Sequence, residues 1–331
     1  MLDIDEERLA RLAKMAHLYH IEGKNQVEVA EAMGMARPMV SRQLKEAEEA
    51  GIVKVRVTYP LRSERLERRF KERFGLAEPR VHIVDESDRT MAKRLIGQAA
   101  ARFLQEEAAG ARKIAISWGS SLYEMVTSLE EIEDRGFEVI QLIGATGLEH
   151  NPNDGPIIAR SLAEKLSARL YLLHAPLVVE STIVADALMK DRVVRETLDK
   201  AKGADIAFVG IGSLERESNS LFRAGYISDK DLGRIKAAGG VGDTCARFFD
   251  AQGRLLDIDI NRRVIGLAPK DLTAIPRVIA VSLGEEKVQS ILGALRGHWI
   301  SGIITDYHTA ERVLELDDQE GRAAPASTKA P

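Results

Sequence analysis

Short apolar runs that alternate with helical stretches fill the chain from about Pro79 onward, and they constrain its fold more than any other feature. Continuous apolar runs flanked by helices are typical of parallel strands whose sheet is covered on both faces. We therefore predict a large α/β domain built on a mostly parallel, Rossmann-like sheet. The expected strands are Val81–Val84, Ile114–Ser117, Val139–Ile143, Leu170–Leu173, Ile206–Ile211, Val278–Ser282 and Gly302–Thr305. The expected helices lie near 90–107, 121–130, 157–168, 192–201, 286–296 and 307–316.

Residues 241–267 depart from this alternation. Thr244–Asp250 and Asn261–Gly266 flank a turn at Gln252 and Gly253. Two β-type runs on either side of a glycine-containing turn are typical of antiparallel pairing. We expect these runs to form an antiparallel extension of the domain.

Residues that follow several predicted strands share one chemistry. Ligands of open α/β sheets bind beyond the carboxyl ends of the strands, where glycines, hydroxyls and helix N-terminal amides suit a phosphate group. Lys287 adds a cation there, and Asp243 and Asp306 are expected to accept hydrogen bonds from sugar hydroxyls. The predicted ligand site consists of Gly119, Ser120, Ser121, Gly144, Gly212, Asp243, Gly284, Lys287, Asp306 and Thr309. Taken singly, each glycine is better explained as a strand-to-helix turn, so the prediction depends on their convergence at one sheet edge.

The first sixty residues are organised differently, as three short helices. Leu9, Leu12, Ala13, Ala16 and Tyr19 repeat at helical spacing within residues 6–22. The pattern then predicts an Asn25 cap, a second helix that buries Val27, Ala30 and Met33, a turn at Gly34, a third helix over about 37–50 and a short strand over 52–57. Two helices joined by a glycine-containing turn match the helix-turn-helix pattern.

The third helix carries residue types that suit a DNA-recognition helix. Basic residues and amides contact phosphates and base edges, and a methionine can touch a thymine methyl group. Residues 36–45 include three basic side chains and no acidic one. The predicted DNA contacts are Gln26, Arg37, Pro38, Met39, Ser41, Arg42 and Lys45, with Gln43 as a further amide. An ordinary three-helix bundle with a solvated third helix is the alternative.

The sequence also predicts where the domains begin and end. We expect a helix-turn-helix domain over 1–58, a linker helix over 59–75, an α/β effector domain over 76–316 and a disordered tail over 317–331. The linker carries an apolar stripe of Leu61, Leu66, Phe70 and Phe74. The tail lacks apolar periodicity. Its composition therefore predicts no packed structure.

Composition excludes some classes of protein and leaves others open. No apolar run approaches the roughly 18 residues of a membrane-spanning helix, so we expect no membrane contact. The single cysteine, Cys245, cannot form an internal disulfide, which fits a reducing cytoplasm. The formal net charge of −4 is not that of a general nucleic-acid binder, so DNA binding has to depend on local charge.

Other kinds of chemistry lack their motifs. Seven histidines are scattered without a zinc-binding spacing, and Gly210-Ile-Gly212 has Glu215 where a dinucleotide fingerprint has its third glycine. Ser120 and Ser121 have no placed histidine partner. We therefore expect no metal site, no cofactor and no catalytic residues.

Two groups of motifs resemble the SorC-type family of bacterial transcriptional regulators. The first is the run GKNQVEVAEAMGMARPMVSRQLKEAEEAGIV over residues 23–53. The second group extends over the α/β domain and comprises WGSS (118–121), ADIAFVGIGS (204–213), GVGDTCARFFD (240–250), INRRVIG (260–266), IPRVIAVSLGEEK (275–287) and ALRGHWI (294–300). Ala36 and Leu283 depart from the family pattern, which commonly has Ser and Gly there.

The resemblance implies a fold similar to sugar-phosphate isomerase and deaminase enzymes, reused as a sensor. Its phosphate would lie on Gly119–Ser121, with Lys287 closing the site. We therefore expect a cytoplasmic regulator that binds a palindromic operator as a dimer or tetramer and responds to a phosphorylated sugar. The alternatives are a sugar-phosphate isomerase or deaminase with an appended helix-turn-helix module, and a scaffold whose N-terminal helices bind only protein.

Overall fold

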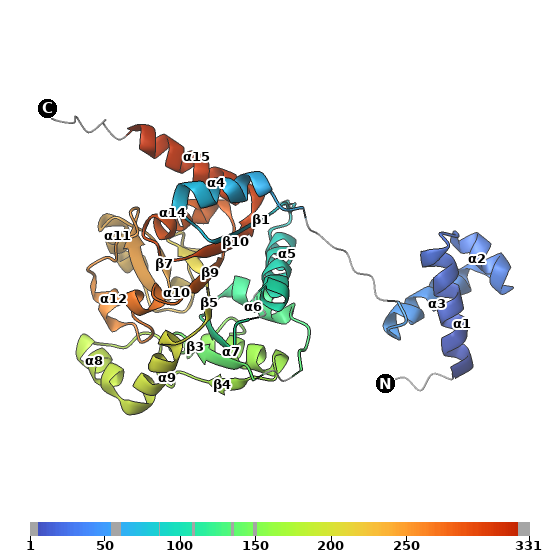
Figure 1. Ribbon diagram of the computed structural model, residues 1–331, viewed down its shortest axis with the longest axis horizontal. Helices are drawn as coiled ribbons and strands as arrows, with labels where there is room; N and C mark the ends of the chain where they lie inside the picture. The colour runs from blue at the N-terminus through green and yellow to red at the C-terminus, as the bar shows by residue number, and fades with distance from the viewer. Residues whose placement is uncertain are drawn as a thin grey trace. The chain divides into compact units, whose positions relative to one another are not determined.

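A computed structural model of the chain describes residues 6–53, 61–85, 87–107, 110–133, 136–147 and 151–323. The chain divides between Tyr59 and Pro60 into two compact units with separate hydrophobic cores (Figure 1). Within the described ranges, no helix is long and apolar enough to cross a membrane.

The smaller unit consists of three helices, as the sequence predicts. They are α1 (Glu6–Ala16) with its π-helical continuation η1 (His17–Ile21), α2 (Gln26–Met33) and α3 (Arg37–Glu49). The predicted burial of Val27 is wrong: Val27 is 49% exposed, and Val29 occupies the core in its place. The helix phase explains the difference, because Val29 and Ala30 of α2 face Val40 and Leu44 of α3 in one cluster. Most of the predicted strand over 52–57 lies outside the described residues.

The ends of α2 are defined by side-chain and backbone caps. The Asn25 side chain accepts hydrogen bonds from the amides of Val27 and Glu28, and Glu28 accepts one from the Asn25 amide at 2.8 Å. This reciprocal capping box confirms the predicted Asn25 cap. Gly34 ends the helix with φ of +65°, a left-handed conformation that glycine adopts without steric cost.

The larger unit is built on a seven-stranded sheet in which every neighbouring pair is parallel. The strand order is β1-β10-β9-β5-β2-β3-β4. All seven predicted apolar runs overlap these strands, with ends that differ by up to three residues, and the run at 206–211 also includes the start of β6. The strands are β1 (Glu78–His82), β2 (Lys113–Ile116), β3 (Glu138–Gln141), β4 (Arg169–Tyr171), β5 (Ile206–Val209), β9 (Arg277–Val281) and β10 (Gly302–Asp306).

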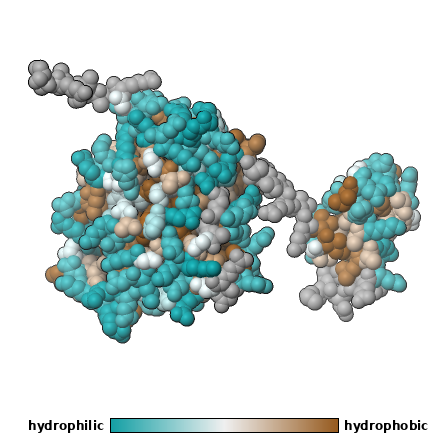
Figure 2. Space-filling model, in the orientation of Figure 1, coloured by the Kyte–Doolittle hydropathy of each residue, from teal (hydrophilic) through white to brown (hydrophobic). Residues whose placement is uncertain are grey.

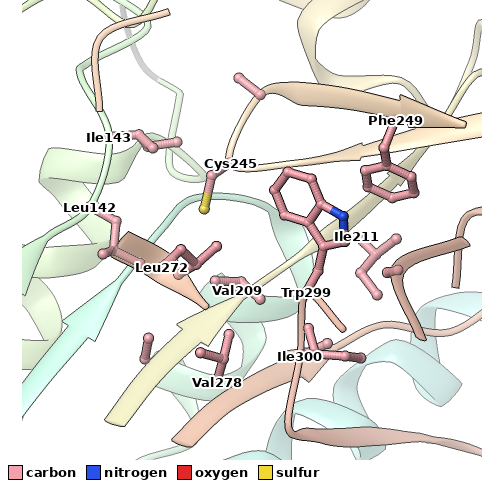
Figure 3. Close-up of a cluster of buried hydrophobic side chains, with 14 of the residues drawn as sticks. Leu142, Ile143, Val209, Ile211, Cys245, Phe249, Leu272, Val278, Trp299 and Ile300 are labelled. Atoms are coloured by element: carbon pink, nitrogen blue, oxygen red, sulfur yellow. The ribbon is translucent and has the colours of Figure 1, made fainter. Parts of the chain in front are cut away.

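Each central strand buries both faces, which explains the continuous apolar runs in the sequence. In β5, Ile206 and Phe208 pack into one core, and Ala207 and Val209 pack into the other. The first core contains α5 (Arg89–Arg102), α6 (Ser120–Thr127) and α7 (Gly155–Lys165). The second core contains α4 (Glu64–Phe74), α9 (Arg192–Lys202), α14 (Val288–Arg296) and α15 (Tyr307–Ala323). Figure 3 shows part of the second core, where the Trp299 ring lies between Phe249 on one side and Val209 of the sheet on the other.

A second, three-stranded antiparallel sheet covers part of this core. It consists of β6 (Ile211–Ser213), β7 (Gly240–Thr244) and β8 (Arg247–Asp250) in sequence order. The predicted antiparallel extension is therefore correct in kind but wrong in its strands. Cys245 and Ala246 both have positive φ and break the predicted run Thr244–Asp250 into two strands with a tight turn.

The other predicted strand of the extension, Asn261–Gly266, is correct only at its end, where Val264 and Gly266 form antiparallel bridges with Val178 and Ile143. Residues 259–263 form helix α12 because Asn261 is tied to the backbone of β8 and the following loop. Its Nδ2 donates to the carbonyls of Phe248 and Leu256, and its Oδ1 accepts from the Phe248 amide, all within 2.9 Å. The Asn261 amide is thereby fully used inside the protein.

The remaining helices connect the strands. They are η2 (Phe103–Glu107), α8 (Thr182–Lys190), α10 (Ser220–Arg223), α11 (Asp229–Ala237), α12 (Asp259–Arg263), α13 (Pro269–Leu272) and η3 (Glu285–Lys287). On the face of the larger unit seen in Figure 2, hydrophilic residues cover most of the surface.

Two predicted boundaries need correction. The predicted tail from Asp317 is helical up to Ala323, as the end of α15, because Asp317 is buried in ion pairs with Arg73 and Arg296. The predicted linker helix is α4, and it packs against β1 and α15 of the larger unit. Leu66 and Phe70 are fully buried there, whereas Leu61 precedes the helix and is 70% exposed.

The Asn261 contacts generate a stability prediction. We expect Asn261→Ala to lower the free energy of unfolding by about 2–4 kcal/mol, because it leaves buried backbone groups without partners. Urea unfolding of the full chain measures this change. The matched control is Gln252→Ala, which removes an exposed amide from the nearby turn. Equal effects of the two substitutions would contradict the structural role of Asn261.

Candidate functional site

The start of α3 presents the predicted DNA contacts to solvent. Arg37, Pro38, Met39, Ser41, Arg42 and Lys45 are all exposed, and Gln26 is half-buried. Over the described residues, the side chains of Arg37 and Arg42 have neither an ion-pair partner nor a hydrogen-bond partner, and Lys45 has only a loose 3.8 Å contact with Glu49. Two unpaired guanidinium groups on one exposed helix are available for an external anion.

A polar hollow of about 870 Å³ lies beside these residues. It is lined by Tyr19, His20, Gly23, Lys24, Asn25, Gln26, Val27 and Arg37. Lys24 is paired with Glu22 at 2.7 Å, so Arg37 and the positive dipole end of α2 supply the available positive charge at this hollow. This combination suits phosphate oxygens.

One predicted amide contact is misplaced. Gln43 lies on the inner face of α3 and is only 8% exposed. Its Oε1 has no hydrogen-bond partner among the residues that the structure describes. Gln43 therefore belongs to the interior of the unit and not to its DNA-facing surface, since the neighbouring Val40, Leu44 and Ala47 are buried on the same face.

The second candidate site lies at the carboxyl edge of the seven-stranded sheet. β2 ends at Ile116, and the chain passes through Gly119, with φ of +121°, into α6 at Ser120. No side chain caps α6, so the first-turn amides of Ser120 and Ser121 have no cap partner. The Gly119 amide, however, donates to the Asn153 carbonyl at 3.1 Å. Ser120 and Ser121, rather than Gly119, thus offer backbone donors at this position.

Asp243 lies directly over Gly212. A Cβ atom at Gly212 would lie 2.2 Å from Asp243 Oδ1, so only glycine leaves room for this carboxyl group. Asp243 is 7% exposed, and burial raises its pKa to about 7, although the charge of Lys287 and a hydrogen bond from the Ala246 backbone oppose the shift. Near neutral pH, this carboxyl group therefore exists in both protonation states.

Lys287 lies at the end of η3, after the β9 strand. It is half-buried, and desolvation lowers its pKa to about 8, while the negative charges of Glu286 and Asp243 act in the opposite direction. The positive charges of Lys93 and Arg223 lower the pKa further. Lys287 therefore lies within reach of two further cations and of the buried Asp243 carboxyl group, an arrangement that suits an anionic ligand with hydroxyl groups.

Asp306 and Thr309 are buried, and they hydrogen-bond to each other and to the Gly284 loop. Thr309 Oγ1 donates to Asp306 Oδ2 at 2.6 Å and accepts from the Gly284 amide at 2.8 Å, while the Thr309 amide donates to Asp306 Oδ1 at 2.8 Å. Both side chains are at most 2% exposed. Instead of facing a ligand, these two residues fix the Gly284 loop that carries Lys287.

Gly144 is likewise placed for packing. A Cβ atom there would lie 2.3 Å from the Pro176 carbonyl oxygen, and the Gly144 amide donates to the Ile265 carbonyl.

The loop after Gly144 borders a separate hollow of about 390 Å³ at the ends of β3 and β4. That hollow is lined by Gln141, Ala145, Thr146, Gly147, Pro156, Leu172, Leu173, His174, Ala175, Pro176 and Tyr226.

Sequence reasoning missed Lys93 and Arg223. Lys93 lies near the start of α5 and Arg223 ends the short helix α10, and neither follows a predicted strand. Their proximity to Lys287 comes from tertiary packing, for which the sequence offers no local signal.

The structure describes no group of three or more His, Cys, Asp or Glu side chains that is arranged to hold a metal ion, within the ranges given above. Cys245 is 5% exposed, and burial together with the Asp243 charge raises the pKa of its thiol to about 12. The thiol therefore stays protonated at neutral pH and is a poor nucleophile.

Comparisons with known proteins extend over both units. The "Sugar-bind" family model, which describes a sugar-binding domain, matches residues 60–315. The deoxyribonucleoside regulator of Bacillus subtilis (strain 168) is 31% identical over 315 residues, 94% of this chain and 99% of that protein. The transcriptional regulator LsrR of Enterobacter sp. (strain 638) is 29% identical over 319 residues, 95% of each chain. The crystal structure of the full-length sorbitol operon regulator SorC from Klebsiella pneumoniae matches with a TM-score of 0.75 and 28% identity, covering 94% of this chain and 100% of that one.

The raised pKa of Asp243 generates a prediction about pH. Folding keeps a proton on Asp243 up to about pH 7, whereas the unfolded chain releases it near pH 4. The group therefore stabilises the fold at low pH, and this contribution is lost as the pH rises from about 4 to 7. Asparagine has no proton to lose. We therefore expect the free energy of unfolding of Asp243→Asn to rise relative to that of the unsubstituted protein across this window, by on the order of 1 kcal/mol per pH unit.

Urea unfolding at pH 5 and pH 8 measures this relative gain. Asp257→Asn, which changes an exposed carboxyl group of the same unit, is the matched control. For Asp257→Asn, the difference in free energy of unfolding from the unsubstituted protein should be the same at both pH values. If the difference for Asp243→Asn were also the same at both, the buried environment inferred for Asp243 would be wrong.

Proposed function

Because the chain belongs to the SorC-type family of sugar-binding transcriptional regulators, we propose that a phosphorylated sugar, bound at the carboxyl edge of the seven-stranded sheet, controls its binding to operator DNA. The position of Lys287 between the buried Asp243 and two further cations, Lys93 and Arg223, carries the proposal. Cations and the Ser120 and Ser121 amides bind the phosphate, and Asp243 accepts from a sugar hydroxyl. The resemblance of this sheet to sugar-phosphate isomerases and deaminases is part of the same proposal.

In this proposal, α3 enters the major groove of DNA. Arg42, Ser41 and Met39 contact base edges, while Arg37, Lys45 and the α2 N-terminus contact phosphates. The exposure of these side chains and the absence of ion-pair partners for Arg37 and Arg42 within the described residues support the assignment. A dimer or tetramer would place paired α3 helices in successive major grooves of a palindromic operator.

The protein acts in the cytoplasm as a sensor without turnover. The sensor function requires only that the ligand bind one DNA-binding arrangement better than another. Turnover of a bound sugar phosphate would favour the alternative, an isomerase or deaminase with an appended DNA-binding module.

Arg42 provides a direct test of the DNA-binding surface. We expect Arg42→Ala to weaken binding to an operator, selected from random DNA by the unsubstituted protein, by about 1–3 kcal/mol. Fluorescence anisotropy at fixed salt measures the affinity, and Lys14→Ala on the exposed side of α1 is the control. An equal loss on operator and random DNA would make Arg42 a phosphate contact. No loss on either would remove it from the interface.

Lys287 provides the corresponding test of the effector site. A sugar phosphate present at 100 times its Kd should stabilise the unsubstituted protein by about 2.7 kcal/mol, which a thermal-shift screen of pentose and hexose phosphates detects. We expect Lys287→Ala to weaken that binding by about 10–100-fold while operator binding persists, because a charge-assisted hydrogen bond is lost.

The exposed residue Lys190 on α8 provides the control, as Lys190→Ala should leave the sugar-phosphate affinity unchanged. Unchanged affinity in Lys287→Ala as well would show that the pocket is wrongly assigned. Binding confined to free sugars would contradict the phosphate assignment.

A further inference from the structure

Helix α4 is the first helix of the larger unit, so it is the helix of that unit nearest in the chain to the DNA-binding unit. A conformational change in the larger unit that is transmitted through the backbone to the DNA-binding unit has to pass through α4. How α4 is held on the larger unit therefore bears on how the two activities are coupled.

Three arginines, one turn apart, attach α4 to α15. Arg65 lies 3.3 Å from Glu311, Arg69 lies 3.0 Å from Asp318, and Arg73 pairs with Asp317. Figure 1 shows α4 and α15 side by side, and this region is largely hydrophilic in Figure 2. In the first two pairs, both side chains are largely exposed, and exposed ion pairs contribute little to stability.

Asp317 differs from the other acidic partners because it is buried. It is 4% exposed, and it also accepts hydrogen bonds from Arg296, with Nη2 at 2.5 Å and Nε at 3.1 Å. Burial raises its pKa, but the hydrogen bonds and charges of Arg296 and Arg73 outweigh this effect, so the pKa lies below its usual value. One ionised carboxylate thus joins three helices: α4 through Arg73, α14 through Arg296, and its own helix α15.

Two of these helices begin at the candidate effector loop. Lys287 immediately precedes α14, and Arg296 is the last residue of that helix. α15 begins one residue after Asp306, and its Thr309 holds the Gly284 amide of the same loop. Helices of this kind are stiff rods that rise about 1.5 Å per residue, so a shift of the loop displaces their far ends as well. Arg296, at the far end of α14, meets Asp317, which lies in the C-terminal half of α15.

We propose that Asp317 is a latch that couples the Gly284–Lys287 loop to α4, and through α4 to the DNA-binding unit. The proposal rests on the proposed function, because it assigns the regulatory connection of the same effector site. Occupancy of the loop shifts α14 and α15 relative to each other and changes how firmly their shared carboxylate holds Arg73.

The first experiment needs no ligand and uses the full chain. We expect Arg73→Gln to raise the hydrogen-exchange rate of the α4 amides about tenfold, because it removes the α4 half of the latch. Arg296 still neutralises Asp317 in this variant, so the unit keeps its buried charge balanced. Arg69→Gln, one turn earlier on α4, removes an exposed pair and should change the rate less than about threefold. Equal exchange in the two variants would overturn the latch.

A double-mutant cycle tests the coupling itself. Thr309→Val removes the hydrogen bond to Gly284 at the loop end of α15. It should raise α4 exchange in the otherwise unsubstituted protein but add little to Arg73→Gln, because the path to α4 is already broken. Additive effects of the two substitutions would show that the loop and α4 are independent, and would overturn the proposal.

Ribose 5-phosphate and inorganic phosphate serve as probes in the final arm. If a probe binds, it should change the operator affinity of the unsubstituted protein and of Arg69→Gln, but not that of Arg73→Gln, which should still bind the probe and DNA separately. An equal response in Arg73→Gln would overturn the latch alone. If no sugar phosphate in the thermal-shift screen binds, the proposed function fails, and the ligand-free cycle still decides the coupling between the loop and α4.

Discussion

The parallel pairing of β2, β5 and β9 is the constraint on which the candidate effector site depends. Phe208 of β5 pairs with both Ile116 of β2 and Ile279 of β9, so the three central strands end at nearly the same level. Their following loops therefore arrive at one edge, with the Ser120 amide on one side and Lys287 on the other. A slip of one residue in this register would turn every buried side chain of the slipped strand to the opposite face.

The parallel sheet could be predicted from the sequence because its signal is local. Each central strand is buried on both faces by its own apolar residues, as Ile206 and Ala207 are in β5, so the run is visible without knowledge of its neighbours. The Asn25 cap and the Gly34 turn were predictable for the same reason, since both act on the adjacent helix. Ser120 and Lys287 come soon after β2 and β9 in the sequence, so predicting these strands also placed both residues at the carboxyl edge of the sheet.

What could not be predicted depends on contacts between distant segments. Asn261 sits in a run of β-forming residues, but its hydrogen bonds to β8 hold it in a helical turn. Asp317 opens a polar stretch without apolar periodicity, and the arginines that order it come from α4 and α14. Arg223 acts on Lys287 only because α10 folds back to the effector loop. The inward orientation of Gln43 depends on the packing of α3 against α1 and α2.

The start of α3 has a consequence for the energetics of recognition. Ala36 lies at the N-cap position and makes no side-chain hydrogen bond to the first turn, where a serine, threonine or aspartate commonly contributes about 1 kcal/mol. Here, however, Pro38 has no amide hydrogen, and the Met39 amide donates to the Ala36 carbonyl at 2.9 Å, so a side-chain cap would have little to bind in this turn. Among the first three residues of α3, Arg37 is left as the one backbone donor without an acceptor inside the helix. In the proposed complex, this amide and the Arg37 guanidinium face the same DNA phosphate, and such a contact strengthens binding to any DNA sequence equally.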